Sequence, residues 1–248
     1  MILFVLLTVS IFYLSVGTKG ESDDFKVTAI EIEGNYHLPK TAYFEYANLD
    51  DKDSFGSLTI NIIRDRLQKH PYVKEVAINK SHNGKVKITL AEKEFRVLLL
   101  LAGKQYLVTK DLEILPVLEN SQKLNYPVVR NVVDEEKLIP LRYAINNGSI
   151  KDSFKILTTA KLLNPGLYDN LSEIDLRNGK GVVLYFSSVN YPVVLGKENQ
   201  IAKMLVFEKL WESIGTVKAN ELLSYVDLRF TNKVYLGVAG EKLEGGEI

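Results

Sequence analysis

The sequence contains no cysteine, only three histidines and no excess of charge of either sign, with 31 basic and 31 acidic residues among 248. The absence of cysteine excludes disulfides, thiolate nucleophiles and zinc–thiolate sites. His37, His70 and His82 include no pair at the three- or four-residue spacing that places two imidazoles on one helix face. Balanced charge provides no basic field for a phosphate backbone, so nucleic acid is a poor candidate partner.

Catalytic and cofactor-binding motifs are also missing. The sequence has no G-x-S-x-G, phosphate loop, G-x-G-x-x-G or H-E-x-x-H. Glu31 and Glu33 fall on one face of a predicted strand, but no pocket pattern accompanies them, and we interpret them as a solvated face. The run Asp50–Asp53 lacks the spaced ligands and the terminal glutamate of a calcium loop. We therefore expect a protein that is not an enzyme, with no cofactor, no metal and no small-molecule substrate.

A long uncharged run opens the chain. Ile2–Val16 has no charged residue, and as a helix it would cover about 22 Å of the ~30 Å hydrocarbon core of a bilayer. That length is short for a membrane span and typical of a signal peptide, and Ser15 and Gly17 are small enough for a cleavage site. A short uncleaved anchor is the other interpretation, and both export the rest of the chain. We assign residues 1–18 to a transmembrane anchor.

Residues 25–93 have the pattern of an α+β domain. Apolar and polar residues alternate in "VTAIEIEG", which predicts a strand that ends at Gly34. One helix is expected after Pro39 and a second over residues 58–69. The segments "YVKEVAINK" and "KVKITLAEKE" alternate again and are joined by the hairpin turn "SHNG". The order strand, helix, helix, strand, strand can bury one face of a sheet beneath two helices.

Residues 94–238 predict a second α+β domain with a mixed or antiparallel sheet. A hairpin, "FRVLLLL" and "QYLVT", opens it, and an irregular stretch punctuated by prolines follows. A helix is expected over residues 150–163, then three strands, and then the most strongly patterned helix of the chain over residues 197–214. A last hairpin, "SYVDLRFTNKVYLGV", completes the domain, and residues 239–248 are expected to be a disordered tail.

These segments carry a resemblance. The glycine that ends the first strand, Gly34, and the turn Pro71-Tyr72-Val73 before the hairpin resemble a POTRA domain. The "VVLG" strand, the helix after it and the later strand "YVDLRF" resemble the β-domain of the FtsQ/DivIB family of bacterial division proteins. POTRA domains also occur in polypeptide transporters and outer-membrane assembly proteins, whereas the second pattern is more specific to division proteins.

The resemblance implies a non-enzymatic scaffold of the divisome. Such a protein crosses the inner membrane once, has most of its chain outside the cytoplasm, and acts at the division septum. Its β-domain holds partners of the FtsB and FtsL type, and the FtsB segment adds as a strand to the last β-strand. Its POTRA domain helps recruitment, which makes Pro71, Tyr72 and Val73 a candidate surface. A turn packed on the sheet is the alternative interpretation of those three residues.

The last strand is the predicted partner site because an edge strand offers unpaired N–H and C=O groups. By alternation, Val234, Leu236 and Val238 are expected to continue the apolar face of Val226, Leu228 and Phe230, with Tyr235 and Gly237 outward. Tyr235→Pro should then remove one donor from the ladder with the partner. An edge blunted by a lysine is the alternative. The candidate partner-binding residues are Phe230, Asn232, Lys233, Val234, Tyr235, Leu236 and Gly237.

Two other functions compete with a divisome scaffold. The first is a POTRA-containing component of polypeptide transport or outer-membrane assembly. Such proteins continue into a transmembrane barrel, and no series of ten-residue lipid-facing strands follows the POTRA-like segment here. The second is a secreted enzyme with an unrecognised site.

Overall fold

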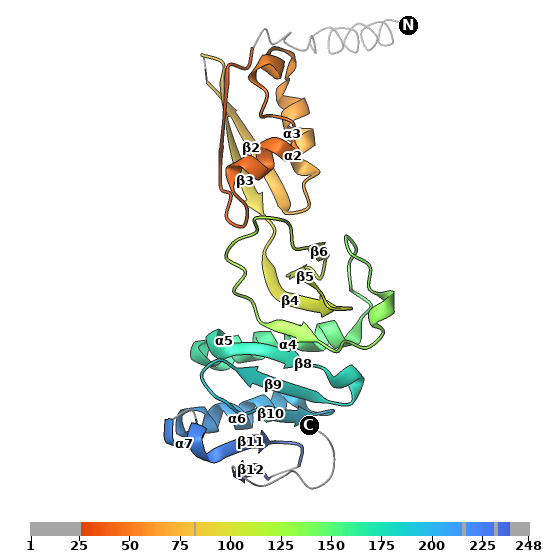
Figure 1. Cartoon of the computed structure of the whole chain (residues 1–248), viewed down its shortest axis with the longest axis vertical. Coiled ribbons are helices and arrows are strands. Elements are labelled where there is room, and N and C mark those ends of the chain that lie inside the picture. Colours follow the sequence, from red (N-terminus) through yellow and green to blue (C-terminus); the bar gives the residue numbers. More distant parts are fainter. Residues whose placement is uncertain (1–25, 82, 215–216, 231–232, 239–248) are drawn as a thin grey trace, which may run out of the picture. The chain divides into compact units, whose positions relative to one another are not determined.

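The computed structural model describes residues 26–81, 83–214, 217–230 and 233–238, and they form two compact units (Figure 1). The first unit contains residues 26–35 and 40–91, and the second contains residues 36–39 and 92–238. The predicted anchor, residues 1–18, and the predicted tail, residues 239–248, lie outside the described residues. Within the described part, no helix combines the length and the apolar character needed to cross a bilayer.

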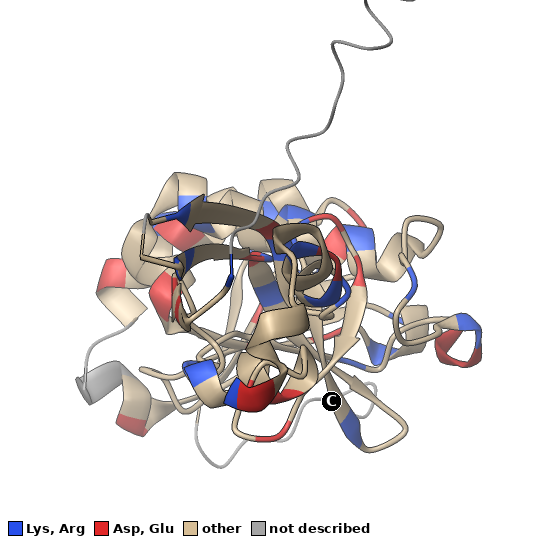
Figure 2. Ribbon diagram, turned by 90° about the horizontal axis from the view of Figure 1, so that it is seen from above, with Lys and Arg blue, Asp and Glu red and all other residues tan. Residues whose placement is uncertain are grey.

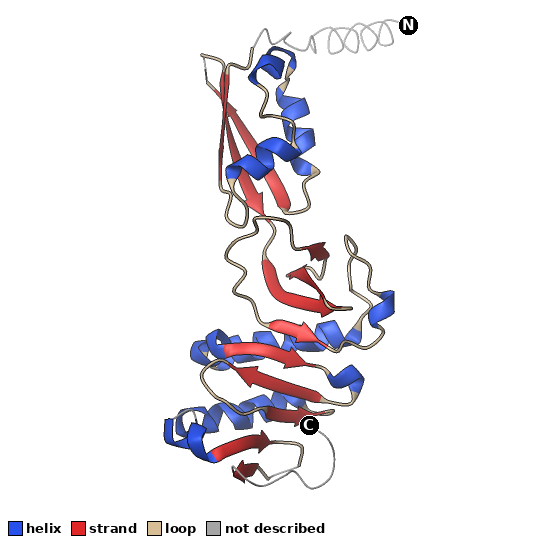
Figure 3. Ribbon diagram, viewed as in Figure 1, coloured by secondary structure: helices blue, strands red, loops and turns tan. Residues whose placement is uncertain are grey.

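The first unit is a three-stranded sheet covered by two helices, as Figure 3 shows. The sheet order is β1-β3-β2, and β1 is parallel to β3. The elements follow the predicted order, with a 3₁₀ turn added between the helices. They are β1 (Ala29–Glu33), α2 (Lys40–Tyr46), η1 (Lys52–Ser57), α3 (Ile60–Gln68), β2 (Val73–Lys80) and β3 (Lys85–Glu92).

Local chemistry explains these boundaries. Thr59 caps α3 by accepting a hydrogen bond from the N–H of Ile62. Gly34 ends β1 with a φ of 84°, and a Cβ placed there would lie 2.1 Å from the carbonyl oxygen of Leu90. Only glycine fits such a close approach at positive φ. The helices bury Tyr43, Ile63 and other apolar side chains against the inner face of the sheet.

The second unit is built on a nine-stranded mixed sheet in the order β12-β11-β10-β9-β8-β7-β4-β5-β6. Its helices are α4 (Gly148–Leu163), α5 (Pro165–Asn170), α6 (Gln200–Ile214) and α7 (Val217–Leu222), with 3₁₀ turns η2 (Glu135–Lys137) and η3 (Arg177–Gly179). The strands are β4 (Phe95–Leu101), β5 (Lys104–Thr109), β6 (Ile114–Pro116), β7 (Val128–Arg130), β8 (Leu171–Asp175), β9 (Val182–Phe186), β10 (Val193–Gly196), β11 (Leu223–Asp227) and β12 (Tyr235–Val238).

Two successive segments of this unit have the same construction. In the first, β7 leads through α4 and α5 to the parallel strand β8, and β9 returns antiparallel to β8. In the second, β10 leads through α6 and α7 to the parallel strand β11, and β12 returns antiparallel to β11. Figure 1 shows the green-to-teal segment followed by its blue counterpart. We call them the first and the second repeat.

The repeats agree residue by residue in the final hairpin. The end of β8 and the two residues after it read "IDLR" at residues 174–177, and the end of β11 and the two residues after it read "VDLR" at residues 226–229, 52 positions later. Asp175 pairs with Val183 and Ile174 with Leu184, while Asp227 pairs with Tyr235 and Val226 with Leu236. The register then shifts by one residue at the same place in both hairpins. β9 and β12 are therefore equivalent strands.

Candidate functional site

β12 is the last strand of the nine-stranded sheet and forms one of its edges. It pairs with β11 on one side, and on its other side no strand from the described residues pairs with it. Its counterpart in the first repeat, β9, is paired on both sides, because β10 continues the sheet there. Within the described residues β12 is therefore an edge strand, which is the arrangement expected for the last strand of the chain.

The direction of the backbone groups follows from the hydrogen bonds of β11. The N–H of Val226 donates to the carbonyl oxygen of Pro192, and the N–H of Leu228 donates to that of Val194, each at a distance of 2.9 Å. The backbone N–H and C=O groups of Asp227 consequently point the other way, toward β12. Those of Tyr235, which lies opposite Asp227, point toward β11. Leu236 then presents its N–H and C=O outward. The expectation that Tyr235 donates to an added strand is wrong by one position.

Exposed apolar side chains surround this edge. Phe230, Tyr235, Leu236 and Val238 are 52 %, 45 %, 46 % and 48 % exposed. The rings of Phe230 and Tyr235 meet edge to face, with their centroids 4.9 Å apart. Phe230 was expected on the buried face of the strand, but β11 ends at Asp227 and the ring lies on the surface. Exposed apolar side chains gathered at one edge of a sheet are typical of interaction sites.

The other predicted partner residues differ in accessibility. Lys233 is exposed and Val234 is partly buried against the core. Gly237, which was expected to face outward, is buried, because the ring of Tyr225 covers it. A Cβ at Gly237 would lie 2.0 Å from that ring. Asn232 lies outside the described residues.

A buried carboxylate ends β11 and directs the chain toward β12. Asp227 accepts a hydrogen bond from the N–H of Arg229 at 2.9 Å and pairs with the guanidinium of Arg229 at 2.7 Å. The hydrogen bond from Arg229 to this carboxylate raises the pKa of the guanidinium above its usual value. This fork holds the turn that begins the last hairpin, and sequence analysis missed it. The recurrence of "DLR" 52 residues after its first appearance was the available signal.

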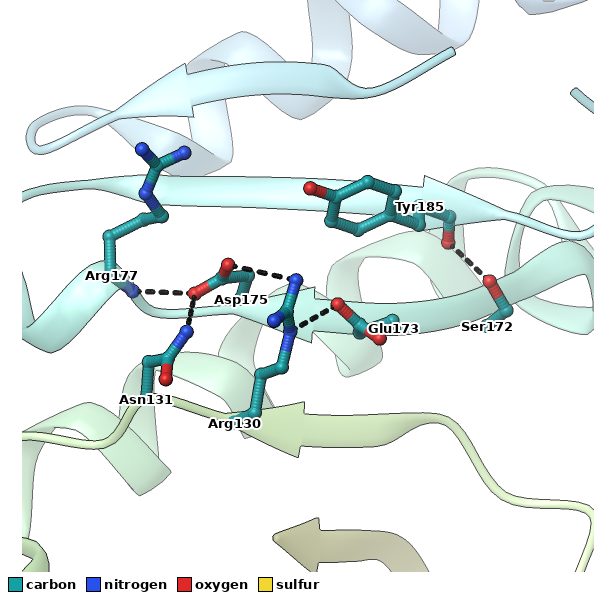
Figure 4. A network of polar contacts seen from close by, with 7 residues as sticks. All are labelled: Arg130, Asn131, Ser172, Glu173, Asp175, Arg177 and Tyr185. Atoms are coloured by element: carbon teal, nitrogen blue, oxygen red, sulfur yellow. Dashed lines mark hydrogen bonds and ion pairs between the residues drawn. The ribbon is translucent and has the colours of Figure 1, made fainter. Parts of the chain in front are cut away.

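The same carboxylate in the first repeat is the centre of a larger network, drawn in Figure 4. Asp175 accepts from the N–H of Arg177 at 2.9 Å and from the side chain of Asn131 at 2.7 Å, and it pairs with Arg130 at 3.1 Å. Arg130 also binds Glu173. Hydrogen-bonded ion pairs tie β7 to β8 here. In the second repeat Val194 takes the strand position opposite Asp227 that Arg130 takes opposite Asp175. Because valine has no charge, the guanidinium that binds Asp227 comes from Arg229 instead.

Comparisons with known proteins agree with this architecture. Residues 25–93 match the model of the POTRA domain, FtsQ-type, and residues 99–229 match the model of the cell division protein FtsQ/DivIB, C-terminal. The second match alone spans more than half of the chain. The chain belongs to the FtsQ/DivIB family of cell division proteins. The FtsQ/DivIB match ends at Arg229, before Phe230 and β12, so it does not reach the candidate edge.

The curated relatives in the FtsQ/DivIB family have low sequence identity to this chain, but the similarity extends over most of its length. The cell division protein FtsQ of Geotalea daltonii is 23 % identical over 210 residues, which are 85 % of this chain and 74 % of that protein. FtsQ of Syntrophotalea carbinolica is 22 % identical over 92 % of this chain and 77 % of its own length. The cell division protein DivIB of Clostridium acetobutylicum is 23 % identical over 85 % of this chain and 82 % of its own length.

In the FtsQ-type POTRA unit, the candidate recruitment residues lie at the start of β2. Tyr72 and Val73 are buried, and Pro71 is partly buried. The ring of His70 stacks among Tyr43, Tyr46 and Tyr72, and its Nδ1 accepts the N–H of Tyr72 at 3.1 Å. The side chains of Tyr72 and Val73 offer no contact surface in this conformation, which favours a turn packed on the sheet.

The charges of this FtsQ/DivIB chain are mixed. In Figure 2 basic and acidic residues are interspersed along the ribbon, and the two signs are equal in number. On β1 and β3 the two signs pair directly, since Lys85 binds Glu31 and Lys87 binds Glu33. Hydrogen bonds from these lysines lower the pKa of both glutamates. Glu31 and Glu33 therefore lie on a solvated face of the sheet, where each forms an ion pair with a lysine of the neighbouring strand.

Proposed function

We propose that this chain is a non-enzymatic scaffold of the bacterial divisome, which captures a partner of the FtsB or FtsL type by adding a strand of that partner to β12. Residues 1–18 hold it in the inner membrane, and both described units work outside the cytoplasm, at the septum. The observation that carries the proposal is the outer edge of β12, on which no strand of the described residues pairs, beside the exposed side chains of Tyr235, Leu236 and Val238.

Elementary energetics supports strand addition at this edge. Each ladder hydrogen bond contributes about 1 kcal/mol net, and burial of one exposed leucine contributes roughly 1.5–3 kcal/mol. A few of each reach about the 8 kcal/mol that corresponds to micromolar affinity, after the cost of association is offset. Backbone pairing supplies affinity, and the alternate side chains choose the partner. Phe230 and Tyr235, whose rings touch, are the residues we assign to that choice.

The first repeat supplies a template for the direction of the added strand. β10 lies antiparallel on β9, with Val193 opposite Leu184 and Val194 opposite Val183. Because β9 and β12 are equivalent, an added strand that imitates β10 runs antiparallel to β12. The residue of the added strand that corresponds to Val193 then faces Leu236, whose backbone groups point outward.

A proline substitution at the outward-facing residue tests the proposal. Leu236→Pro removes the outer N–H without removing a bond to β11, while Leu236→Ala removes the side chain and keeps the N–H. We expect Leu236→Pro to abolish co-purification of the FtsB-type partner from the same organism, and Leu236→Ala to weaken it only partly. Both variants should unfold at nearly the wild-type temperature. Full capture of the partner by a folded Leu236→Pro variant would overturn strand addition.

A further inference from the structure

A second apolar surface lies on α6. Leu205 and Val206 are 46 % and 44 % exposed in the middle of this helix, and Leu210, one turn after Val206, is partly buried. Large apolar side chains on the exposed side of a helix are unusual when the helix already covers a sheet with its other side. The two repeats indicate what belongs on this surface.

The helices α4 and α6 can be aligned by their C-terminal ends, and two buried positions of each helix then coincide. Ser153 and Ile156 are buried in α4, and Met204 and Phe207 are buried in α6, with both pairs 51 residues apart. The helices also end 51 residues apart, at Leu163 and Ile214. One extra residue then precedes α7, which restores the offset of 52 in the hairpins. Lys155 and Thr159 of α4 are therefore equivalent to Val206 and Leu210 of α6.

In the first repeat, that flank of the helix is turned toward α6. Lys155 and Thr159 line a hollow of about 520 Å³ that Ile201 of α6 borders. They do not line the hollow on the other flank of α4, which Arg96 borders and which Phe154 and Thr158 share. The equivalent flank of α6, with Val206 and Leu210, is thus the side on which a third helix would lie.

The end of the sheet beneath α6 also has an apolar side chain with no helix packed on it in the described part of the chain. In the first repeat, the ring of Phe186 on β9 packs on Phe207 and Trp211 of α6, with centroids 5.3 Å and 5.0 Å apart. Val238 occupies the equivalent position on β12 and is exposed, and no residue in the described ranges takes the part that α6 plays for Phe186. The part of the chain that the structure describes therefore leaves the apolar residues of β12 and the Val206 flank of α6 uncovered at the end of the second repeat.

We propose that the partner that adds a strand to β12 also supplies an apolar helix, which covers Leu236 and Val238 and packs on the Val206–Leu210 flank of α6. The partner thereby supplies the strand and the helix with which a third repeat would begin. In the template, α6 begins at Gln200, shortly after β10 ends at Gly196. The partner segment is accordingly a short strand, a loop of a few residues and an amphipathic helix of about four turns. The inference rests on the proposed strand addition and extends it to a second contact.

The neighbouring residue Leu205 is a matched control, since it is exposed to the same degree. It lies one turn after Ile201, on the flank of α6 that faces α4. We expect Val206→Glu to weaken binding of the FtsB-type partner about tenfold, as loss of one buried apolar contact does, and Leu205→Glu to leave the affinity unchanged. Leu236→Pro should abolish binding in the same assay. Binding that is lost in Leu236→Pro but equal in the two glutamate variants would reject the helix contact and retain strand addition. Binding unaffected by all three would reject both.

A labelling experiment gives a second readout that does not depend on a charged substitution. The chain has no cysteine, so Val206→Cys and Leu205→Cys each carry a single thiol for a maleimide probe. Saturation with the FtsB-type partner should slow labelling of Val206→Cys at least tenfold and leave that of Leu205→Cys unchanged. Equal labelling of Val206→Cys with and without bound partner would overturn the proposal.

Discussion

Leu184 and Leu236 occupy the same position in two successive hairpins, each opposite the residue before the aspartate of a "DLR" segment, yet Leu184 is fully buried and Leu236 is 46 % exposed. The hairpins share their register and the position of their bulge, so the difference comes from the neighbours. Leu184 has β10 beside it and α6 above, and Leu236 has neither within the described residues. Burial of one leucine is worth roughly 1.5–3 kcal/mol, which is available to an association at β12.

Proline at Tyr235 should act differently from proline at Leu236. The register points the N–H of Tyr235 toward Asp227 of β11, so Tyr235→Pro breaks the internal ladder. We expect this variant to lose about 1–3 kcal/mol of stability in the last hairpin, with faster amide exchange at Gly237, while Leu236→Pro retains the wild-type protection. Amide hydrogen exchange measures both. Equal protection of Gly237 in the two variants would contradict the assigned direction of the backbone groups.

Asp227→Asn should destabilise the second unit. The carboxylate of Asp227 is buried and accepts bonds from the backbone and the side chain of Arg229, and hydrogen bonds to charged groups contribute about 1.5–3 kcal/mol each. We expect a loss of about 2 kcal/mol in chemical unfolding, together with weaker partner capture because the turn before β12 loosens.

Asp152→Asn is the control for that variant. Asp152 pairs with Lys155 on the exposed surface of α4, at 2.8 Å, and such pairs contribute about 0–1 kcal/mol. Equal losses in the two variants would show that the Asp227 fork does not hold the hairpin.

Periodicity predicted much of this fold but missed elements with few residues. The helices over 58–69, 150–163 and 197–214 appear as α3, α4 and α6, shifted by two to three residues at their starts. β6 and β7 have three residues each, too few to display alternation, and they are strands because β5, β4 and β8 flank them. The helices α5 and α7 have six residues each and were missed for the same reason.

At the candidate site the edge position was predicted and the details were not. Alternation placed Phe230 on a buried face, but it assumed that the strand continues past Asp227, where the fork with Arg229 turns the chain. Alternation also assigned Leu236 and Val238 to the face of Val226 without indicating whether anything covers them. The exposure of a strand residue depends on which strand lies beside it and which helix packs above it, and the alternation within the strand indicates neither.

Gly34→Ala should destabilise the POTRA unit. The residue has a φ of 84°, and a Cβ there would lie 2.1 Å from the carbonyl oxygen of Leu90, which is backbone and cannot move aside cheaply. Left-handed strain alone costs about 1–3 kcal/mol, and the clash adds to it. Gly56→Ala is the control, because a Cβ at Gly56 meets no atom within 4 Å. Unfolding of both variants at the wild-type midpoint would show that β1 tolerates a side chain at its end.

Tyr191→Phe should change the response of the second unit to alkaline pH. Tyr191 is buried, its hydroxyl donates to the carbonyl oxygen of Ile214 at 2.5 Å, and burial raises its pKa to about 12. The unfolded chain loses this proton near pH 10, and the folded chain keeps it. Between those values the folded state binds more protons, so its stability falls as pH rises.

The difference between wild type and Tyr191→Phe isolates this effect from the titration of other groups. At pH 7 the variant should be about 1 kcal/mol less stable, since the carbonyl of Ile214 loses its donor. By pH 11 the gap should shrink by about 1 kcal/mol, because only the wild type pays for retaining the proton. Urea unfolding at the two pH values measures the gap. A gap that stays constant would mean that the Tyr191 hydroxyl titrates in the folded chain as it does in water, and a gap that widens would mean that its pKa is lowered by folding; either result would contradict the prediction.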